Sequence, residues 1–323
     1  MTQALNASSL TGVFPVLPTP FDANGQIDLD ALRRLARYLI ACRVDGMTFP
    51  GVASEVAKLS EAERVAAGRA LLEEVGGAVP VVIGISAGDS AAVLRLAQDA
   101  AQAGAAALMV AAPPDIDSVA GQIKRLGLIA QAVPSVPLML QNVPAPVGAG
   151  LEPEAIVEIL EAVPAVRYVK EETLPSGQRL SAIRAQAPAT LIGVLGGAGG
   201  RYITDELRRG ACGTMPAIEL AEVHVALFEA HREGDADSVR RLFTRMLPVL
   251  NIQAVFRWSL TKYVLKKRGL IAHEGQRMAG PLLDARDRED VDAFMQDMSD
   301  LLLPQRVIDG VRNHKQEAAH GTA

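Results

Sequence analysis

The sequence predicts an α/β fold, a (β/α)8 TIM barrel with a small helical C-terminal extension. Eight short apolar runs, rich in β-branched residues, alternate with longer segments of helical periodicity. The runs are continuously hydrophobic rather than alternating in character, as expected of parallel strands covered by helices. A closed barrel and an open doubly wound sheet both fit this alternation. The count of eight favours the barrel, and the lack of a GxGxxG motif after the first run argues against a dinucleotide-binding sheet.

The predicted strands follow one another at regular intervals along the chain. They cover residues 12–19, 46–51, 79–86, 107–113, 136–144, 166–172, 190–196 and 213–217. Hydrophobic residues make up 49% of the chain but aromatic residues only 4%, so Ala, Val, Leu and Ile must fill the core. That mixture suits buried strands packed against helices.

The segments between these runs carry clear helix signals. Asp28 and Asp89 stand at expected N-caps, and Ser60 with Glu63 forms a capping box. Pro153 stands near the first turn of another expected helix. Several helices end in a glycine before the next run, at Gly76, Gly104 and Gly210.

After the eighth run the pattern is helical only, and it includes residues 237–250, 252–268 and 290–303. We therefore divide the chain into three parts. They are the barrel strands and helices at 1–218, the last barrel helix with a helical extension at 219–311, and a tail at 312–323. The tail is rich in polar and small residues, so we expect it to be disordered.

Charge and the scarcer residue types exclude several functions. The net charge is −5 over 323 residues, without a basic run, so a nucleic-acid partner is not expected. Cys42 and Cys212 lack CxxC spacing, and the five histidines, from His224 onward, lack ligand spacing, so no metal is predicted. No apolar run is long enough for a membrane span, and residues 1–10 lack a leader pattern. We expect a cytoplasmic protein that needs no cofactor.

Catalytic groups in such a barrel lie at the C-terminal ends of the strands. The sixth run ends in Lys170, Glu171 and Glu172. Alternation along a strand places Lys170 and Glu172 on one face and Glu171 on the other. Burial in an apolar barrel should lower the lysine pKa, and a neutral amine is what imine formation requires. The alternative is a strand-end lysine that extends into solvent or pairs with Glu171.

The loop after the second run, Gly51 to Glu55, combines a glycine turn with small residues. Its backbone amides and the Ser54 hydroxyl could hold a carboxylate, so Gly51, Ala53 and Ser54 are candidate substrate-binding residues. The alternative is a plain tight turn in which Glu55 caps the next helix.

Three other strand ends supply candidates. Gln141 and Asn142 end the fifth run, where their amides could bind substrate; Asn142 would also suit a turn. Gly196 begins a glycine-rich loop after the seventh run, which could leave space for a substrate or form a flexible turn. Met215, in the eighth run, completes the predicted substrate-binding set.

Taken together, these segments resemble the dihydrodipicolinate synthase and N-acetylneuraminate lyase family of class I Schiff-base lyases. The resemblance extends from Gly12 to Arg268. It rests on Thr19-Pro-Phe-Asp22 with Ile27-Asp28, the 51–55 loop with Leu59-Ser60 and Glu63-Arg64, Asn142-Val-Pro144, and Val169-Lys170-Glu171. It implies that Lys170 is the Schiff-base lysine, that the substrate is a 2-keto acid such as pyruvate, and that the protein is a homotetramer or homodimer.

The chain departs from the family pattern where protons and the second substrate are handled. The 51–55 loop lacks the two threonines of dihydrodipicolinate synthases, and Gln141 replaces the tyrosine before Asn-x-Pro. Pro146 stands in place of the arginine that follows, and Pro114 and Asp115 replace the paired tyrosines after strand four. Synthesis of the dihydrodipicolinate precursor is therefore disfavoured.

The replacements resemble the 2-keto-3-deoxy sugar-acid dehydratases of the same superfamily, in particular the L-2-keto-3-deoxyarabonate dehydratases. The shared features are Ser54-Glu55, Gln141 and a second glutamate two residues after the lysine, Glu172. The segment after the eighth run, Thr214-Met-Pro-Ala217, does not match them.

We therefore expect a lyase that forms an imine between Lys170 and a 2-keto acid and then acts as a dehydratase or an aldolase. Glu172 is the candidate proton carrier, which a pKa raised toward neutrality would suit, and Gln141 would bind a substrate hydroxyl or a water. Two alternatives stay open. One is pyruvate condensation of the 4-hydroxy-tetrahydrodipicolinate synthase type, and the other is a keto-acid-binding regulator without turnover.

Overall fold

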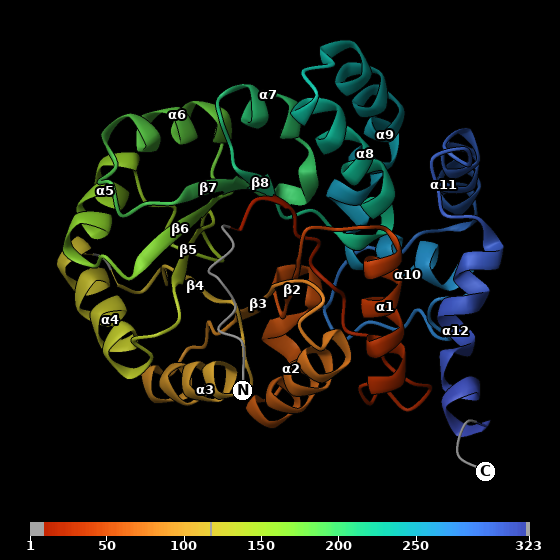
Figure 1. Ribbon diagram of the computed structural model, residues 1–323, viewed down its shortest axis with the longest axis horizontal. Coiled ribbons are helices and arrows are strands. Elements are labelled where there is room, and N and C mark those ends of the chain that lie inside the picture. The colour runs from red at the N-terminus through yellow and green to blue at the C-terminus, as the bar shows by residue number, and fades with distance from the viewer. Residues whose placement is uncertain (1–9, 117, 321–323) are drawn as a thin grey trace.

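Eight parallel strands form a barrel ringed by helices in the computed structural model, which describes residues 10–116 and 118–320 (Figure 1). The predicted (β/α)8 TIM barrel is confirmed. The strands pair in the order β1-β8-β7-β6-β5-β4-β3-β2, and Val16 bridges to both Thr48 and Ala217, which joins the two ends of the sheet. The strands are β1 (Gly12–Val13), β2 (Met47–Phe49), β3 (Val81–Gly84), β4 (Ala107–Ala111), β5 (Leu138–Asn142), β6 (Val166–Glu171), β7 (Gly193–Gly196) and β8 (Gly213–Thr214).

Helices α1 to α8 form the outer ring, and α9 to α12 form the C-terminal extension (Figure 1). No helix in the described part of the chain is both long and apolar enough to cross a membrane. The helices are α1 (Leu29–Ala41), α2 (Glu61–Val75), α3 (Ser90–Gln102), α4 (Val119–Ala132), α5 (Pro153–Ala162), α6 (Ser176–Gln186), α7 (Ile203–Arg208), α8 (Ala221–Arg232), α9 (Ala236–Phe256), α10 (Trp258–Lys267), α11 (Ala285–Asp297) and α12 (Gln305–His320). Short 3-10 turns are η1 (Val52–Ser54), η2 (Val56–Lys58), η3 (Ala198–Gly200) and η4 (Ile218–Leu220).

The residues that the sequence predicted to start and end helices do so in the structure. The Asp28 side chain accepts a hydrogen bond from the Ala31 amide at 2.8 Å and starts α1. Ser60 and Glu63 form both hydrogen bonds of the capping box that starts α2. Gly76 ends α2 with φ of 55°, a left-handed conformation that favours glycine.

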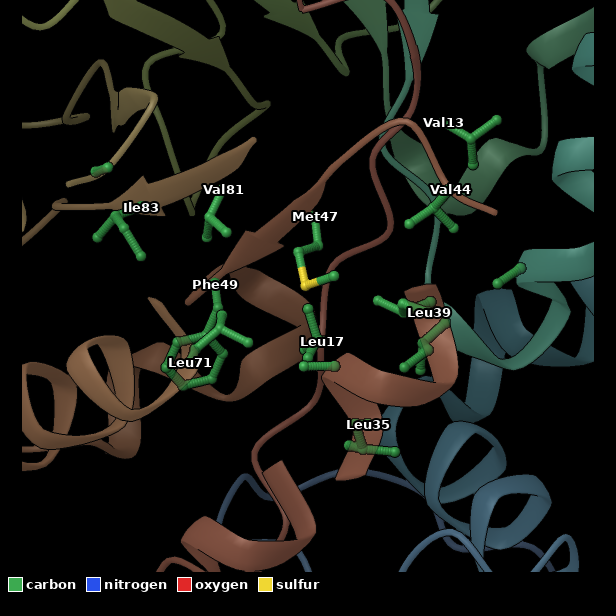
Figure 2. Packing of buried hydrophobic residues seen from close by; sticks show 14 of the residues in the cluster. Val13, Leu17, Leu35, Leu39, Val44, Met47, Phe49, Leu71, Val81 and Ile83 are labelled. Carbon is green, nitrogen blue, oxygen red and sulfur yellow. The ribbon is translucent and has the colours of Figure 1, made fainter. Parts of the chain in front are cut away.

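Alternation along the strands divides the apolar core into two parts. The inside of the barrel is filled by Leu10, Phe14, Val16, Val82, Ala107, Met109, Met139, Tyr168, Leu195 and Met215. The outer part lies between strands and helices. Figure 2 shows part of it, with Met47, Phe49, Val81 and Ile83 of β2 and β3 near Leu35, Leu39 and Leu71 of α1 and α2. Because the inside is packed with side chains, a ligand can bind only at an end of the barrel.

The C-terminal extension differs from the prediction in two places. Helix α9 continues through Pro248 to Phe256, and the chain turns only at Arg257, where φ is 38°. The tail expected to be disordered from residue 312 is helical in α12 as far as His320, and residues 321–323 lie outside the described residues. Ile308 of α12 is buried, and α12 packs against α1. This tertiary contact stabilises a helix that its polar composition alone would not favour.

A buried ion pair joins the extension to the barrel. Lys262 of α10 lies 2.5 Å from Glu55 Oε1, and both side chains are fully buried. The other carboxylate oxygen of Glu55 accepts hydrogen bonds from the amides of Arg277 and Met278 at 2.6 and 2.7 Å. The Phe21 ring contacts both the Lys262 and Arg277 cations, at 4.2 and 4.4 Å. Glu55 therefore does not cap the next helix; it binds the segment that follows α10.

Replacing Lys262 with Met should lower the free energy of unfolding by about 3–5 kcal/mol, because Glu55 then stays buried without its cation. Urea titration followed by circular dichroism measures this loss. The double variant Lys262→Met with Glu55→Gln should recover part of it, because no unpaired charge is left. A single variant within roughly 0.5 kcal/mol of the parent protein would contradict the role of the pair.

Candidate active site

Lys170 is the last residue of β6 whose side chain faces the inside of the barrel, and it lies at the C-terminal mouth. Its side chain is buried, and its Nζ lies 2.5 Å from Glu172 Oε1. In register, Lys170 stands opposite Gln141 on β5 and Leu195 on β7, and Leu195 belongs to the barrel interior. The predicted shared face of Lys170 and Glu172 is confirmed. The lysine neither extends into solvent nor pairs with Glu171.

Glu172 is the centre of this group. Gln141 Nε2 donates to its Oε1 at 3.0 Å, and the Ala198 backbone amide also hydrogen-bonds to its carboxylate. Burial raises the pKa of Glu172, but Lys170 and these donors outweigh it and bring the pKa below its ordinary value. The expectation of a pKa raised toward neutrality is therefore wrong for the free protein. We call Lys170, Glu172 and Gln141 the Lys170 cluster.

A cavity of about 580 Å³ reaches the Lys170 cluster at Gln141. Its wall includes Gly51 and Val52 from the loop after β2 and Met109 and Ala111 from β4. Of the three residues predicted to be catalytic, Gln141 lines this space, and Lys170 and Glu172 lie next to Gln141 without forming part of the cavity wall. Among residues 10–116 and 118–320, the His, Cys, Asp and Glu side chains form no group of three that could hold a metal ion.

Asn142 and Glu171 lie on the opposite, outer face of the barrel wall. Asn142 Nδ2 donates to Glu171 Oε2 at 2.9 Å and to the Leu151 carbonyl at 3.0 Å, while Oδ1 accepts from the Leu151 amide at 2.8 Å. These bonds occupy the Asn142 amide on the side of the wall away from the Lys170 cluster, so the structure does not bring Asn142 together with the other predicted site residues. Burial raises the pKa of Glu171, although Asn142 and the Thr173 amide oppose the rise.

The Ser54 hydroxyl forms hydrogen bonds with two backbone groups of the protein. It accepts a hydrogen bond from the Gly51 amide at 2.9 Å and donates to the Leu17 carbonyl at 2.5 Å, and Ser54 is fully buried. The structure thus directs this hydroxyl to backbone groups and not to the cavity. Ala53 packs at the edge of the barrel interior, and Gly51 lines the cavity. From the same region, Val52, Val56 and Leu59 also line the cavity.

The glycine loop approaches the Lys170 cluster one residue later than predicted. Gly196 faces outward, because a Cβ there would lie 1.8 Å from Glu206 Oε2. At Gly197, a Cβ would lie 2.5 Å from Glu172 Cγ and 2.8 Å from Lys170 Cε. Only glycine lets the chain pass so close to the lysine, so Gly197 takes the position that sequence reasoning assigned to Gly196.

Sequence reasoning also misses Ala198 and misplaces Met215. The Ala198 amide binds Glu172, in a turn where Ala198 has φ of 50°. Nothing in the residue type signals that role. Met215 packs inside the barrel and does not form part of the cavity wall. Leu195 faces inward. Because side chains alternate along a strand, position 197 should also face inward, and this rule would have identified Gly197 instead of Gly196.

Glu206 of α7 is a buried carboxyl behind the glycine loop. Its Oε1 accepts a hydrogen bond from Ser176 Oγ at 2.7 Å, whereas Oε2 has no hydrogen-bond partner among the described residues. Burial, reinforced by the charge of Glu172, raises the pKa of Glu206 to about 7. The folded protein therefore keeps this carboxyl protonated at pH values where an unfolded chain would ionise it.

Glu206→Gln, which mimics the protonated acid, should stabilise the protein at alkaline pH. The folded pKa lies above the unfolded one, so stability is full below about pH 4.5 and is lost as pH rises toward 7. At pH 8 the variant should gain up to about 3 kcal/mol, and near pH 4.5 the gain should vanish. Denaturant titrations at the two pH values test this. A gain that does not depend on pH would contradict the assignment.

The fold and the site together define a class of protein. A buried lysine at the C-terminal mouth of a (β/α)8 barrel, beside a carboxylate, is the arrangement of barrel enzymes that form an imine with a carbonyl substrate. Residues 9–298 match the model of the Dihydrodipicolinate synthetase family. The chain belongs to this family and is a class I Schiff-base-forming lyase.

Several relatives match nearly the whole chain. The 4-hydroxy-tetrahydrodipicolinate synthase of Acidothermus cellulolyticus is 29% identical over 314 residues, which cover 93% of this chain and 95% of the relative. The L-2-keto-3-deoxyarabonate dehydratase of Azospirillum brasilense is 27% identical over 299 residues, covering 90% and 96%. The crystal structure of dihydrodipicolinate synthase from Rhodopseudomonas palustris has a TM-score of 0.84 at 29% identity, covering 92% and 100%. Relatives of both activities are thus similarly distant in sequence.

Proposed function

We propose that this protein is a dehydratase of a 2-keto-3-deoxy sugar acid, with Lys170 as the imine-forming residue. The observation that carries the proposal is the Lys170 cluster, in which a carboxylate lies 2.5 Å from the lysine and a glutamine holds that carboxylate. Glu172 thus lies where one group can exchange protons with both the lysine and its substrate. The Azospirillum relative named as a dehydratase supports this reaction type.

Imine formation begins with a proton transfer inside the cluster. Glu172 takes a proton from Lys170, and the free amine attacks the C2 carbonyl of the keto acid. The protonated Glu172 then assists the loss of the C2 oxygen as water, which leaves a cationic iminium. By giving up this proton Glu172 returns to the carboxylate form that the next step needs.

Elimination uses the same carboxylate as a base and then as an acid. Glu172 removes a C3 proton, and the electron pair forms the enamine. The enamine expels the C4 hydroxyl, which leaves as water with the proton returned by Glu172. Hydrolysis of the resulting unsaturated iminium restores Lys170 and releases a keto acid that has lost one water overall.

Backbone and amide groups would position the substrate. The loop after β2 reaches the cavity through Gly51 and Val52. The Gly51 amide is bound by Ser54, so the amides of Val52 and Ala53 are the candidate donors to the C1 carboxylate. Gln141 lines the same cavity and is the candidate partner of a substrate hydroxyl. Both assignments place the keto group between the loop and the lysine.

The positions of the tyrosines disfavour a synthase mechanism that relies on a phenol as proton relay. The chain has four tyrosines. Tyr38 and Tyr263 donate hydrogen bonds to carboxylates elsewhere, and Tyr168 accepts one from the Leu10 amide inside the barrel. Tyr202 is exposed on the loop after β7. Glu172, rather than a tyrosine, is therefore the acid–base group beside Lys170.

Product analysis separates dehydration from the other reactions open to this family. A single keto acid that is lighter by one water indicates a dehydratase. Pyruvate with an aldehyde indicates an aldolase, and consumption of pyruvate with an aldehyde indicates a condensing synthase. No covalent adduct and no turnover would indicate a keto-acid-binding regulator.

Borohydride reduction in the presence of pyruvate should add the mass of the reduced pyruvyl group to one peptide, at Lys170. Peptide mass spectrometry locates the adduct. The Lys170→Ala variant should give none, whereas Lys124→Ala, which removes an exposed lysine of α4, should keep it. An adduct at any other lysine would refute the assignment.

Glu172→Gln should retain the trapped adduct but dehydrate its substrate about 10²- to 10⁴-fold more slowly, because an amide cannot exchange the proton. The readouts are adduct yield and product mass over time. Glu171→Gln is the matched control on the outer face of the same strand, and its catalytic rate should stay close to that of the parent. Full turnover by Glu172→Gln would remove Glu172 from the mechanism.

A further inference from the structure

Trp258, the first residue of α10, contacts the loop that follows β2. Its indole Nε1 donates a hydrogen bond to the Val52 carbonyl at 3.0 Å, although the two residues lie 206 positions apart in the chain. The indole ring is partly buried, and a Cβ on Gly280 would lie 3.4 Å from its Cζ3 atom. The C-terminal extension therefore binds, through this side chain, a loop residue that lines the cavity.

The backbone of this loop has two amides that no other group of the protein occupies. The Gly51 carbonyl accepts a hydrogen bond from the Ser54 amide at 3.0 Å, and the Gly51 amide donates to the Ser54 hydroxyl at 2.9 Å. The amides of Val52 and Ala53 have no acceptor within the part of the chain that the structure describes. These are the two N–H groups that the proposed function assigns to the C1 carboxylate.

The hydrogen bond from Trp258 determines the direction of one of these amides. The Val52 carbonyl and the Ala53 N–H belong to one planar trans peptide unit, in which the C=O and N–H bonds point in opposite directions. Because α10 lies outside the ring of strands (Figure 1), the carbonyl points away from the barrel and the Ala53 N–H points toward its mouth. Ala53 packs against the apolar interior of the barrel, which agrees with this direction.

Trp258 is the donor to the Val52 carbonyl that is fixed from outside the loop. The Glu55 amide also donates to this carbonyl, at 3.1 Å, but it belongs to the same loop and moves with it. The position of Trp258 is set by α10, where the next residue, Ser259, is buried and accepts a hydrogen bond from the Leu283 amide at 3.1 Å. The indole therefore holds the peptide unit against rotation.

We propose that Trp258 is a positioning residue for the C1 carboxylate of the keto acid, which it orients through the peptide unit between Val52 and Ala53. The inference rests on the proposed function for the binding of that carboxylate at this loop. Trp258 does not form part of the cavity wall, so it acts through the loop and not by touching the substrate. A carboxylate bound to the Ala53 N–H would also polarise the peptide and strengthen the hydrogen bond from the indole, because hydrogen bonds in a chain reinforce one another.

Trp258→Phe keeps an aromatic ring and removes the N–H donor. Two probes are titrated against borohydride trapping at Lys170: pyruvate, and methyl pyruvate, which lacks the carboxylate charge. The variant should raise the half-saturating concentration of pyruvate about 5- to 50-fold and leave that of methyl pyruvate within about twofold. The adduct yield at saturation should stay within about twofold of the parent, because the Lys170 cluster is unchanged.

Tyr263→Phe is the matched control on the same helix. It also removes a polar donor from an aromatic ring, but the partner of Tyr263 is Asp292 of α11, at 3.0 Å. The half-saturating concentrations of both probes should stay within about twofold of the parent. Equal increases for pyruvate and methyl pyruvate in folded Trp258→Phe would overturn the proposal, and so would no increase for pyruvate.

A measurement on the parent protein tests the same coupling without a variant. Trp258 is the only tryptophan of the chain, so protein labelled with nitrogen-15 in the indole gives one indole N–H resonance by NMR. Pyruvate should shift this resonance with the half-saturating concentration found by trapping, and methyl pyruvate should shift it less. A resonance that saturating pyruvate does not move overturns the role of Trp258, whether or not the variants fold. A shift without any covalent adduct refutes the Lys170 chemistry and leaves the role of Trp258 standing.

Discussion

The ion pair between Lys170 and Glu172 depends on a geometric constraint that governs the whole barrel. Eight parallel strands around a packed interior leave each strand residue one of two directions, inward or toward the helices. On β6 this directs Lys170 inward and Glu171 outward, and the chain after the strand returns Glu172 to the lysine. The two charges meet because the strand ends there and the interior below them is filled by apolar side chains.

The same constraint separates two buried polar systems that are adjacent in sequence. On the inner side, Glu172 is bound by Lys170, Gln141 and the Ala198 amide, and its pKa is lowered. On the outer side, Glu171 is bound by Asn142, and burial raises its pKa. Consecutive glutamates therefore differ in protonation behaviour because the barrel wall gives them different neighbours. Glu172 lies beside Lys170, whereas Glu171 binds Asn142 and the Thr173 amide.

The C-terminal extension and the glycine loop give this mouth its particular shape. Lys262 binds Glu55 at the end of the loop after β2, and Gln253 binds Arg201 after the loop that follows β7. Both partners come from helices beyond the eighth barrel strand. Both loops are thus held in place by contacts from outside the barrel.

Local patterns in the sequence already determined the eight strands, the helix starts at Asp28 and Ser60, and the inward direction of Lys170 with Glu172. These features depend on alternation along a strand and on neighbours within a few residues. Alternation applied consistently would also have turned Asn142 outward. Only the tertiary structure decided that the Ser54 hydroxyl is bound to Leu17, that Gly197 rather than Gly196 passes the lysine, and that the pKa of Glu172 falls. Those outcomes depend on distances between segments far apart in the chain, which residue type and spacing do not encode.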